Sequence, residues 1–185
     1  MGALRNIKVL DLSRILAGPY STQILSDLGA EIWKVESPWG DDTRQWGPPF
    51  LNKESSYYLS ANRGKKSLII NLKSEKGQNI IKDLAKKADI LVENFKVGNL
   101  AKFGLDYKSL SEINPKLIYA SVTGFGQTGP RSSEPGYDAA LQGMTGIMSV
   151  TGEPDGRPTK VGVAWIDILT GLNATIGILG ALNER

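Results

Sequence analysis

The chain has 185 residues, of which 41% are hydrophobic and 22% charged, and its 22 Lys and Arg against 19 Asp and Glu give a net charge of +3. This is the composition of an ordinary globular protein, and the length suffices for one sizeable core, so we expect a single domain over residues 1–185. The lysines are scattered instead of forming one basic run, which argues against a nucleic-acid partner.

Two residue types are missing altogether, Cys and His. The lack of Cys excludes disulfides and thiolate metal sites and suits the cytoplasm. The lack of His removes the commonest general base near neutral pH and the commonest zinc ligand. Charges at Arg5, Lys8 and Asp11 come too early for a signal peptide. We therefore expect a cytoplasmic protein without a bound metal, whose chemistry uses carboxylates, Lys, Tyr, Ser, Thr or backbone amides.

The first elements form a β-α-β unit. An apolar strand at Val9–Leu12 leads through Ala17-Gly18-Pro19 into an amphipathic helix, and a second strand follows at Glu31–Glu36. Pro19 suits the first position of that helix, and Gly29 suits its end. The turn thus meets a helix N-terminus, where free N–H groups favour anions and polarised carbonyls.

Helices and strands continue to alternate along the chain. Strands are predicted at Ser67–Asn71, Ile90–Glu93 and Leu117–Val122, and helices at Ser74–Ala88, Gly98–Phe103 and Tyr107–Ile113. This alternation predicts an α/β fold: an open, mainly parallel, Rossmann-like sheet of about six strands with helices on both faces.

The stretch Ser37–Ser56 interrupts this pattern with several Pro and Gly residues and with Trp39, Trp46 and Phe50. It predicts an ordered surface loop packed on its own aromatic rings. A lid over a ligand is the alternative.

The C-terminal segment is unusually apolar. Between Val161 and Leu182 the only charged residue is Asp167, and Ile166–Asn183 forms a helical pattern that is apolar almost all round. An Asp within a bilayer costs roughly 2.5–3.5 kcal/mol, so we expect a buried helix instead of a membrane span. A buried helix at this place needs a cover, which predicts a dimer or larger assembly.

A literal G-x-G-x-x-G motif occurs at Gly124–Gly129, after a predicted strand. The dinucleotide fingerprint requires a helix that opens within the motif and an acidic residue at the end of a second strand. Pro130 follows the third glycine, and the residues 131–135 (RSSEP) do not suit a helix. We therefore expect a flexible glycine turn and no NAD site.

Two longer motifs are more specific. Asp11–Pro19 reads D-x-[ST]-R-x-x-A-G-P, and Leu28–Glu36 reads L-G-A-E-[IV]-x-K-V-E. Together they resemble the opening of the family III CoA-transferases, the group that includes formyl-CoA transferase and α-methylacyl-CoA racemase. The glycine turn, in Ser121–Pro130, is similar to another family motif. Because family members are longer, the chain resembles their N-terminal portion, which suggests an expressed fragment, a split gene product or a degraded gene.

The resemblance implies that Asp167 is the catalytic nucleophile. Without it, an Asp before an apolar helix is read as an N-cap. The helix dipole is expected to keep the carboxylate ionised in either role. As a nucleophile it would attack an acyl-CoA thioester to give a mixed anhydride, and CoA would then form an aspartyl thioester. An acceptor carboxylate would displace that CoA through a second anhydride.

The resemblance also implies the contacts with coenzyme A. They fall on Ile15, Leu16 and Ala17 for the pantetheine, on Ile70 and Lys73 for the adenine and phosphate end, and on Asn94, Phe95, Lys102 and Phe103. Taken singly, the apolar ones suit core packing and Lys73 suits a solvated charge. A family arginine that meets the nucleotide phosphates is Ser37 here, and Lys34 and Arg44 are the candidates to replace it.

Two further readings stay open beside the transferase. In the racemase branch a His precedes an Asp, whereas this chain has Tyr137 before Asp138, and a tyrosine of ordinary pKa is a poor base at neutral pH. The resemblance therefore assigns Tyr137 and Asp138 to binding of the acid substrate. A CoA-binding or interaction domain without catalysis is the other reading. The resemblance further implies an interlocked homodimer, and it places the glycine-rich loop that closes the family's active site beyond residue 185.

Overall fold

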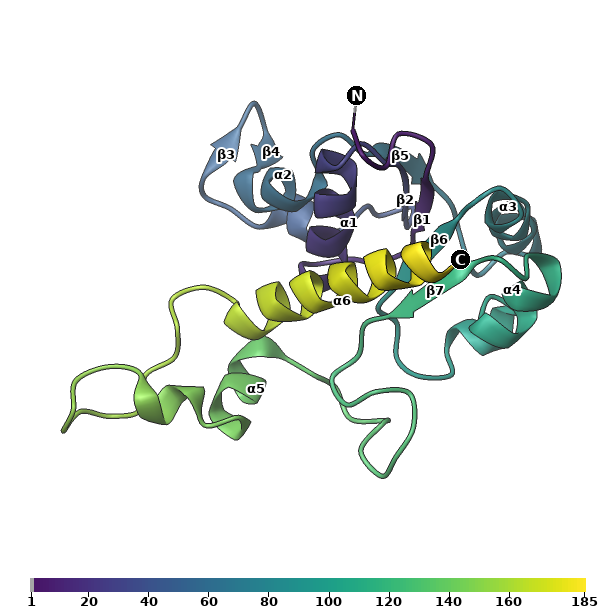
Figure 1. Cartoon of the computed structure of the whole chain (residues 1–185). Helices are drawn as coiled ribbons and strands as arrows, with labels where there is room; N and C mark the ends of the chain where they lie inside the picture. The colour runs from purple at the N-terminus through teal and green to yellow at the C-terminus, as the bar shows by residue number, and fades with distance from the viewer. Residues whose placement is uncertain (1) are drawn as a thin grey trace.

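The computed structural model describes residues 2–185 and contains one parallel sheet of five strands (Figure 1). The strands are β1 (Lys8–Asp11), β2 (Glu31–Glu36), β5 (Lys66–Ile69), β6 (Ile90–Glu93) and β7 (Ile118–Ser121), in the order β5-β2-β1-β6-β7. The predicted α/β fold with a mainly parallel sheet is confirmed, with five strands in the sheet where about six were expected. The other two, β3 (Phe50–Leu51) and β4 (Glu54–Ser55), form a separate antiparallel hairpin.

Helices cover both faces of the sheet, as predicted. α1 (Ala17–Asp27) and α6 (Trp165–Glu184) lie on one face, and α3 (Glu75–Ala85) and α4 (Tyr107–Ile113) lie on the other. Alternate residues of β1 enter two different cores, because successive side chains of a strand point to opposite faces. Val9 packs with Leu25 of α1 and Ile178 of α6, whereas Leu10 packs in the cluster that contains residues of α3 and α4.

The first helix begins two residues earlier than expected. α1 begins at Ala17, so Pro19 is its third residue instead of its first. The change is harmless, because the first-turn N–H groups of a helix have no partner within the helix. At the far end of α1, Gly29 has a φ of 102°, as its predicted role as a helix stop requires.

The aromatic loop is ordered, as predicted. It contains a short 3-10 helix, η1 (Asp42–Gln45), and the β3–β4 hairpin, and it leads into α2 (Ser56–Asn62). The Trp46 ring meets the Tyr57 ring edge to face, with 5.2 Å between the ring centroids. Trp39, in contrast, is exposed, so only part of the loop packs on its own aromatic rings.

The glycine motif after β7 lies in a loop that runs to Tyr137 without a helix or strand. Gly126 and Gly129 have φ angles of 80° and 93°, which suit glycine in a turn. The predicted glycine turn is confirmed, and the helix that a dinucleotide fingerprint requires is absent from it. The chain then forms α5 (Asp138–Met144) and η3 (Ile147–Val150), which project away from the sheet (Figure 1); the remaining short helix, η2 (Leu100–Phe103), follows β6.

α6 is apolar, as predicted, but only one side of it is buried. Its buried residues are Gly171, Thr175 and Ile178. Gly171 permits close contact with α1, since a Cβ there would lie 2.7 Å from the Ala17 carbonyl oxygen. The expectation of a buried helix is therefore wrong within this chain, because α1, α5 and β7 contact only part of α6 and leave Ile176 66% exposed.

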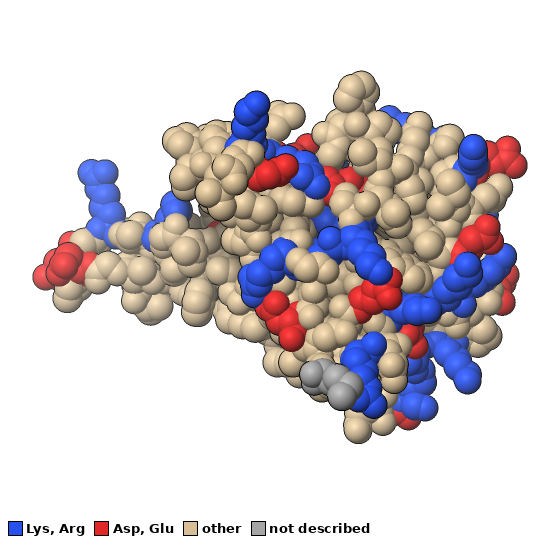
Figure 2. Space-filling model, turned by 90° about the horizontal axis from the view of Figure 1, so that it is seen from above, with Lys and Arg blue, Asp and Glu red and all other residues tan. Residues whose placement is uncertain are grey.

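Among residues 2–185, α6 is also the one helix whose length and hydropathy would suit a membrane span. Length and composition alone are weak grounds, because the core helix of a globular protein meets the same test. On the face seen in Figure 2, Lys and Arg side chains stand in several groups with Asp and Glu between them. That face agrees with the scattered lysines of the sequence.

Candidate functional site at the carboxyl edge of the sheet

The order in which the chain adds strands to the sheet reverses between β1 and β6: β2 and β5 lie on one side of β1, and β6 and β7 lie on the other. The chain leaves β1 into α1 on one face and leaves the neighbouring β6 toward α4 on the other face. Such a switch point opens a crevice outside the carboxyl ends of the strands, where open α/β sheets bind their ligands. Three groups of the predicted CoA contacts follow carboxyl ends of strands: Ile15–Ala17 after β1, Ile70 and Lys73 after β5, and Asn94 and Phe95 after β6.

Asn94 joins the two loops at the switch point. Its side-chain Oδ1 accepts the backbone N–H of Arg14 at 3.0 Å, and its Nδ2 donates to the Arg14 carbonyl at 2.7 Å. The next residue, Ile15, has a φ of 70°, which costs a β-branched residue roughly 1–2 kcal/mol. Strain of this kind persists where neighbouring contacts fix the backbone, and it is typical of ligand-binding turns. The structure thus brings the predicted residues Ile15 and Asn94 together.

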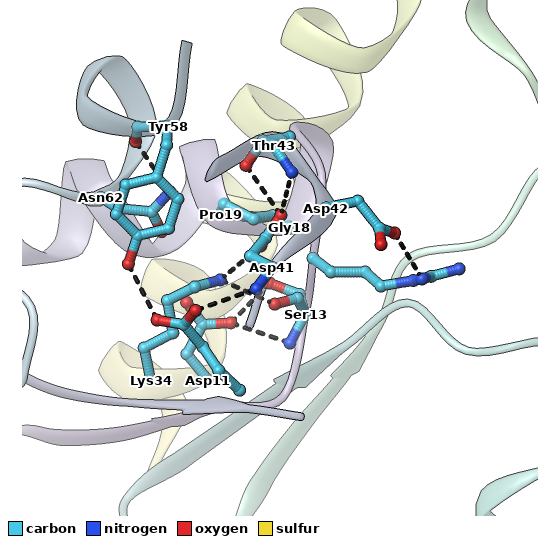
Figure 3. Close-up of polar contacts among 12 residues, drawn as sticks. Asp11, Ser13, Gly18, Pro19, Lys34, Asp41, Asp42, Thr43, Tyr58 and Asn62 are labelled. Carbon is cyan, nitrogen blue, oxygen red and sulfur yellow. Dashed lines mark hydrogen bonds and ion pairs between the residues drawn. The ribbon is translucent and has the colours of Figure 1, made fainter. Parts of the chain in front are cut away.

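A buried carboxylate lies beneath this turn (Figure 3). Asp11 accepts a hydrogen bond from the Ser13 N–H at 2.9 Å. It also accepts one from the Thr22 hydroxyl at 2.6 Å and pairs with Lys65 at 3.1 Å. Burial raises the pKa of Asp11, but Lys65, Lys34 and these hydrogen bonds outweigh burial and bring the pKa below its usual value. Asp11 is therefore an ionised support of the turn, a role that the motif letters alone did not indicate.

Lys34 and Arg44 are not free to replace the family arginine that is Ser37 here. The Lys34 ammonium is buried and donates to the Ser13 carbonyl and to Asp41, each at 3.0 Å. Arg44 donates two hydrogen bonds of 2.7 Å to Glu36 in the bidentate geometry of a strong pair. The expectation that Lys34 takes over the phosphate contact is therefore wrong, because its ammonium is buried, and a carboxylate already holds Arg44.

The remaining predicted CoA contacts divide into buried and exposed residues. Leu16, Ala17 and Ile70 are buried, and Phe95 and Phe103 are partly buried against the core on the α3 side. Lys73 and Lys102 are exposed, and Lys102 donates to Asn99 at 3.2 Å. Core packing is therefore a real role of the apolar members. Lys73 carries the one charge that extends from the loop after β5.

Asp167 lies in the first turn of α6, but it is not the cap of that helix. The residue at the cap position is Ala164, whose methyl side chain cannot accept a hydrogen bond. The Asp138 Oδ1 instead accepts the N–H groups of Ile166 at 2.8 Å and of Asp167 at 3.4 Å, while Gln142 donates to the other Asp138 oxygen at 2.6 Å. The N-cap reading of Asp167 is wrong, because a carboxylate from α5 already fills that role.

The pKa of Asp167 is raised to about 6, chiefly by burial and further by the negative charge of Asp138. The pKa is therefore not lowered, as the N-terminus of a helix acting alone would lower it. At pH 7 the carboxylate is still ionised in about nine molecules of ten, because its pKa lies about one unit below that pH. A carboxylate that is ionised yet more basic than usual suits a nucleophile.

Tyr57 of α2 is a neighbour that the sequence did not reveal. Burial raises its pKa, and the charges of Asp167, Asp138 and Asp41 raise it further. Its neutral phenol therefore lies within the field of the Asp167–Asp138 pair, beside Trp46. Tyr137, the predicted substrate contact, is instead 71% exposed. The sequence signal that could have indicated Tyr57 was the aromatic loop, which ends at the residue before it.

A cleft of about 390 Å³ lies between the end of β7 and the first half of α6. Its walls are partly polar and include Ser121, Thr123, Thr170 and Asn173, and Ile166, next to Asp167, also lines it. Residues 2–185 contain no cluster of three or more Asp or Glu placed to hold a metal ion.

A family model described as CoA-transferase family III matches residues 4–185. The chain is 52% identical to a succinate–glutarate CoA-transferase of Agrobacterium fabrum, over 97% of the chain and 46% of that protein. It is 51% identical to the human succinyl-CoA:glutarate CoA-transferase, over 98% of the chain and 42% of that protein. The crystal structure of a CAIB/BAIF family protein from Brucella suis superposes with a TM-score of 0.97 and 52% identity, over 100% of the chain and 50% of that structure. The chain therefore spans about half the length of these relatives.

Proposed function

This chain belongs to CoA-transferase family III, and we propose that it binds CoA at the carboxyl edge of its sheet and supplies Asp167 as the nucleophile that moves CoA between carboxylic acids. The observation that carries the proposal is the state of Asp167. Its carboxylate is partly buried and has a pKa of about 6. Asp138 caps α6, so the Asp167 oxygens are not used for that purpose.

The reaction proceeds through exchanges at one carboxylate. An Asp167 oxygen attacks the thioester carbonyl of the donor, the carbon–sulfur bond breaks, and CoA leaves as a thiolate, which gives an aspartyl–acyl anhydride. The thiolate attacks the aspartyl carbonyl and releases the donor acid. The acceptor carboxylate then expels CoA from the aspartyl thioester, and the thiolate takes the new acyl group and regenerates the Asp167 carboxylate. Burial limits the access of water to these intermediates.

The residues that hold CoA are those predicted at the strand ends. The turn at Ile15–Ala17, clamped by Asn94, presents backbone and apolar groups to the pantetheine. Lys73 faces solvent in the loop after β5 and provides a charge for the phosphates. Because Lys34 and Arg44 are paired internally, we expect a dissociation constant of about tens of micromolar, near −6 kcal/mol.

The names of the relatives suggest the substrates. Both curated relatives described above are named for transfer between succinate and glutarate. We propose short dicarboxylic acids of this kind as the acyl groups, with Tyr137 and Asp138 near the bound acid. We further propose a homodimer in the cytoplasm, in line with the lack of Cys and the exposed apolar side of α6.

Two alternatives remain as outcomes of the test. One is a CoA-binding domain without catalysis. A racemase is disfavoured, because Tyr137 stands where that branch has its His.

The test is a trapping experiment. The chain is incubated with succinyl-CoA, quenched with hydroxylamine and digested, and mass spectrometry searches for a hydroxamate on the peptide that contains Asp167. Asp167→Asn serves as the variant and Asp155→Asn, in an exposed loop, as the matched control. A hydroxamate on Asp167 in the wild type and the control supports the transferase. CoA binding without any adduct would support the alternative of a CoA-binding domain without catalysis. An adduct on another residue would refute the role of Asp167.

A further inference from the structure

One buried cation, the Lys34 ammonium, joins the turn that follows β1 to the aromatic loop that follows β2. Lys34 of β2 donates to the Ser13 carbonyl, at the start of the turn after β1, and to Asp41, at the start of the aromatic loop segment (Figure 3). Both distances are 3.0 Å, and the Lys34 and Asp41 side chains are each 1% exposed. The contact is therefore shielded from solvent, and a single ammonium group fixes both segments.

On the side of the turn, Ser13 is held by more than one group. Its N–H and its hydroxyl both donate to Asp11, while its carbonyl accepts from Lys34. The strained Ile15 follows two residues later, and Asn94 clamps Arg14 between them. The backbone that enters the turn consequently has little freedom.

On the side of the loop, Asp41 organises the segment that leads to Trp46. Its Oδ1 accepts the Thr43 N–H at 3.0 Å and so caps η1, and its own N–H donates to Glu36 at 2.9 Å. Trp46 follows η1 directly and donates its N–H to the Thr43 carbonyl at 3.1 Å. The position of the Trp46 ring on Tyr57 therefore depends on where Asp41 is held.

A buried ion pair is a poor means of gaining stability, because removing both ions from water offsets their attraction, and a neutral pair of similar shape is often as stable. The pair does, however, fix a distance and a direction between the groups it joins. We propose that Lys34 is a positioning residue that keeps the Ser13–Leu16 turn in register with the Asp41–Trp46 segment, so that the CoA contacts and the Trp46–Tyr57 pair share one geometry. The CoA part of this inference rests on the proposed function.

The experiment compares two double variants of the chain. Lys34→Met with Asp41→Asn removes both charges, nearly preserves side-chain size, and leaves an amide oxygen to cap η1. The matched control is Lys66→Met with Glu31→Gln, which removes an exposed pair of 2.6 Å from the same sheet. Asp41→Asn alone is the second variant, in case the double variant does not fold. The protein is labelled with fluorotryptophan, and the Trp46 signal among the four tryptophans is assigned with Trp46→Phe.

Two quantities are measured on folded protein: the fluorine resonance of Trp46 without ligand, and the dissociation constant of CoA by calorimetry. We expect the Lys34/Asp41 variant to shift or split the Trp46 resonance and to raise the dissociation constant of CoA about tenfold, or about 1.4 kcal/mol. The control should leave both unchanged. A wild-type Trp46 resonance, or wild-type affinity for CoA, in that variant would overturn the inference. If the wild-type chain binds no CoA, the proposed function fails separately, and the fluorine signal alone decides the coupling.

Discussion

The carboxylate of Asp138 caps the helix whose first turn carries Asp167, and its charge adds to burial in raising the pKa of Asp167. The two aspartates lie on different helices, α5 and α6, and divide two tasks. One satisfies backbone N–H groups, while the other keeps its oxygens available. The basicity of Asp167 is thereby linked to the residue that positions its helix.

Two substitutions of Asp138 separate capping from charge. Asp138→Asn retains an oxygen for the cap but removes the charge, so the pKa of Asp167 should fall from about 6 toward its usual value. Asp138→Ala should do the same and also cost about 1 kcal/mol of stability through the lost cap. Carbon NMR titration of the Asp167 carboxyl and thermal unfolding measure the two effects. An Asp167 titration that stays near 6 in Asp138→Asn would refute the electrostatic link.

Asp167 itself should make the stability of the protein depend on pH. Its pKa is raised from 3.8 to about 6 in the folded state, so the folded state binds the proton more tightly than the unfolded chain. The stability that this proton provides is present below the unfolded pKa and is lost as the pH rises through 6.

Asp167→Asn cannot ionise and should avoid that loss. We expect near-equal stabilities at pH 4 and a variant that is more stable by roughly 1–2 kcal/mol at pH 7, a figure reduced for partial exposure of the carboxyl. Urea denaturation across this range measures the difference, with Asp155→Asn as the surface control. A difference that does not change with pH would show that Asp167 titrates normally.

Binding of CoA should depend on Lys73. Calorimetry with CoA and acetyl-CoA should give dissociation constants of about tens of micromolar, and Lys73→Ala should weaken binding because a charge opposite the phosphates is lost. Lys108→Ala, an exposed lysine on α4, serves as the control and should bind as the wild type does. NAD should cause no thermal shift, because no helix opens within the motif at Gly124–Gly129. The absence of any heat or thermal shift at millimolar CoA would contradict the proposed site.

The parallel sheet was predictable because its strands are short apolar runs bounded by helical patterns, and Ile90–Glu93 matches β6 at both ends. Irregular features were harder to predict. The β3–β4 hairpin has two residues in each strand, too few for an alternating pattern to emerge. The exposure of α6 was mispredicted because composition measures how apolar a helix is, and not how many neighbours cover it.

The sequence also did not reveal which residues contact one another in the candidate site. The motif around Asp11 indicated which loop matters, but pairing partners such as Lys34 with Asp41 depend on tertiary contacts that no local pattern specifies. Lys34 looked like a free cation in the sequence and is fully buried. Asp167 looked like a cap because the alternative cap, Asp138, lies 29 residues earlier in the chain.

The last prediction concerns association of the chain. The exposed apolar side of α6 includes Leu172 and Ile176, which are 38% and 66% exposed and lie one turn apart. Apolar side chains that share one helix face favour association, because contact with a second molecule removes them from water. Light scattering should therefore show a dimer or larger species at micromolar concentrations.

Leu172→Lys with Ile176→Lys should shift the protein toward monomer, because two charges on that face resist desolvation and repel their copies across a twofold interface. Leu51→Lys is the matched control, since Leu51 is 61% exposed on the β3–β4 hairpin, away from α6, and it should associate as the wild type does. Far-ultraviolet circular dichroism checks that the variants are folded. A wild-type chain that stays monomeric throughout, or a Leu51 variant that dissociates equally, would rule out the α6 face as the contact.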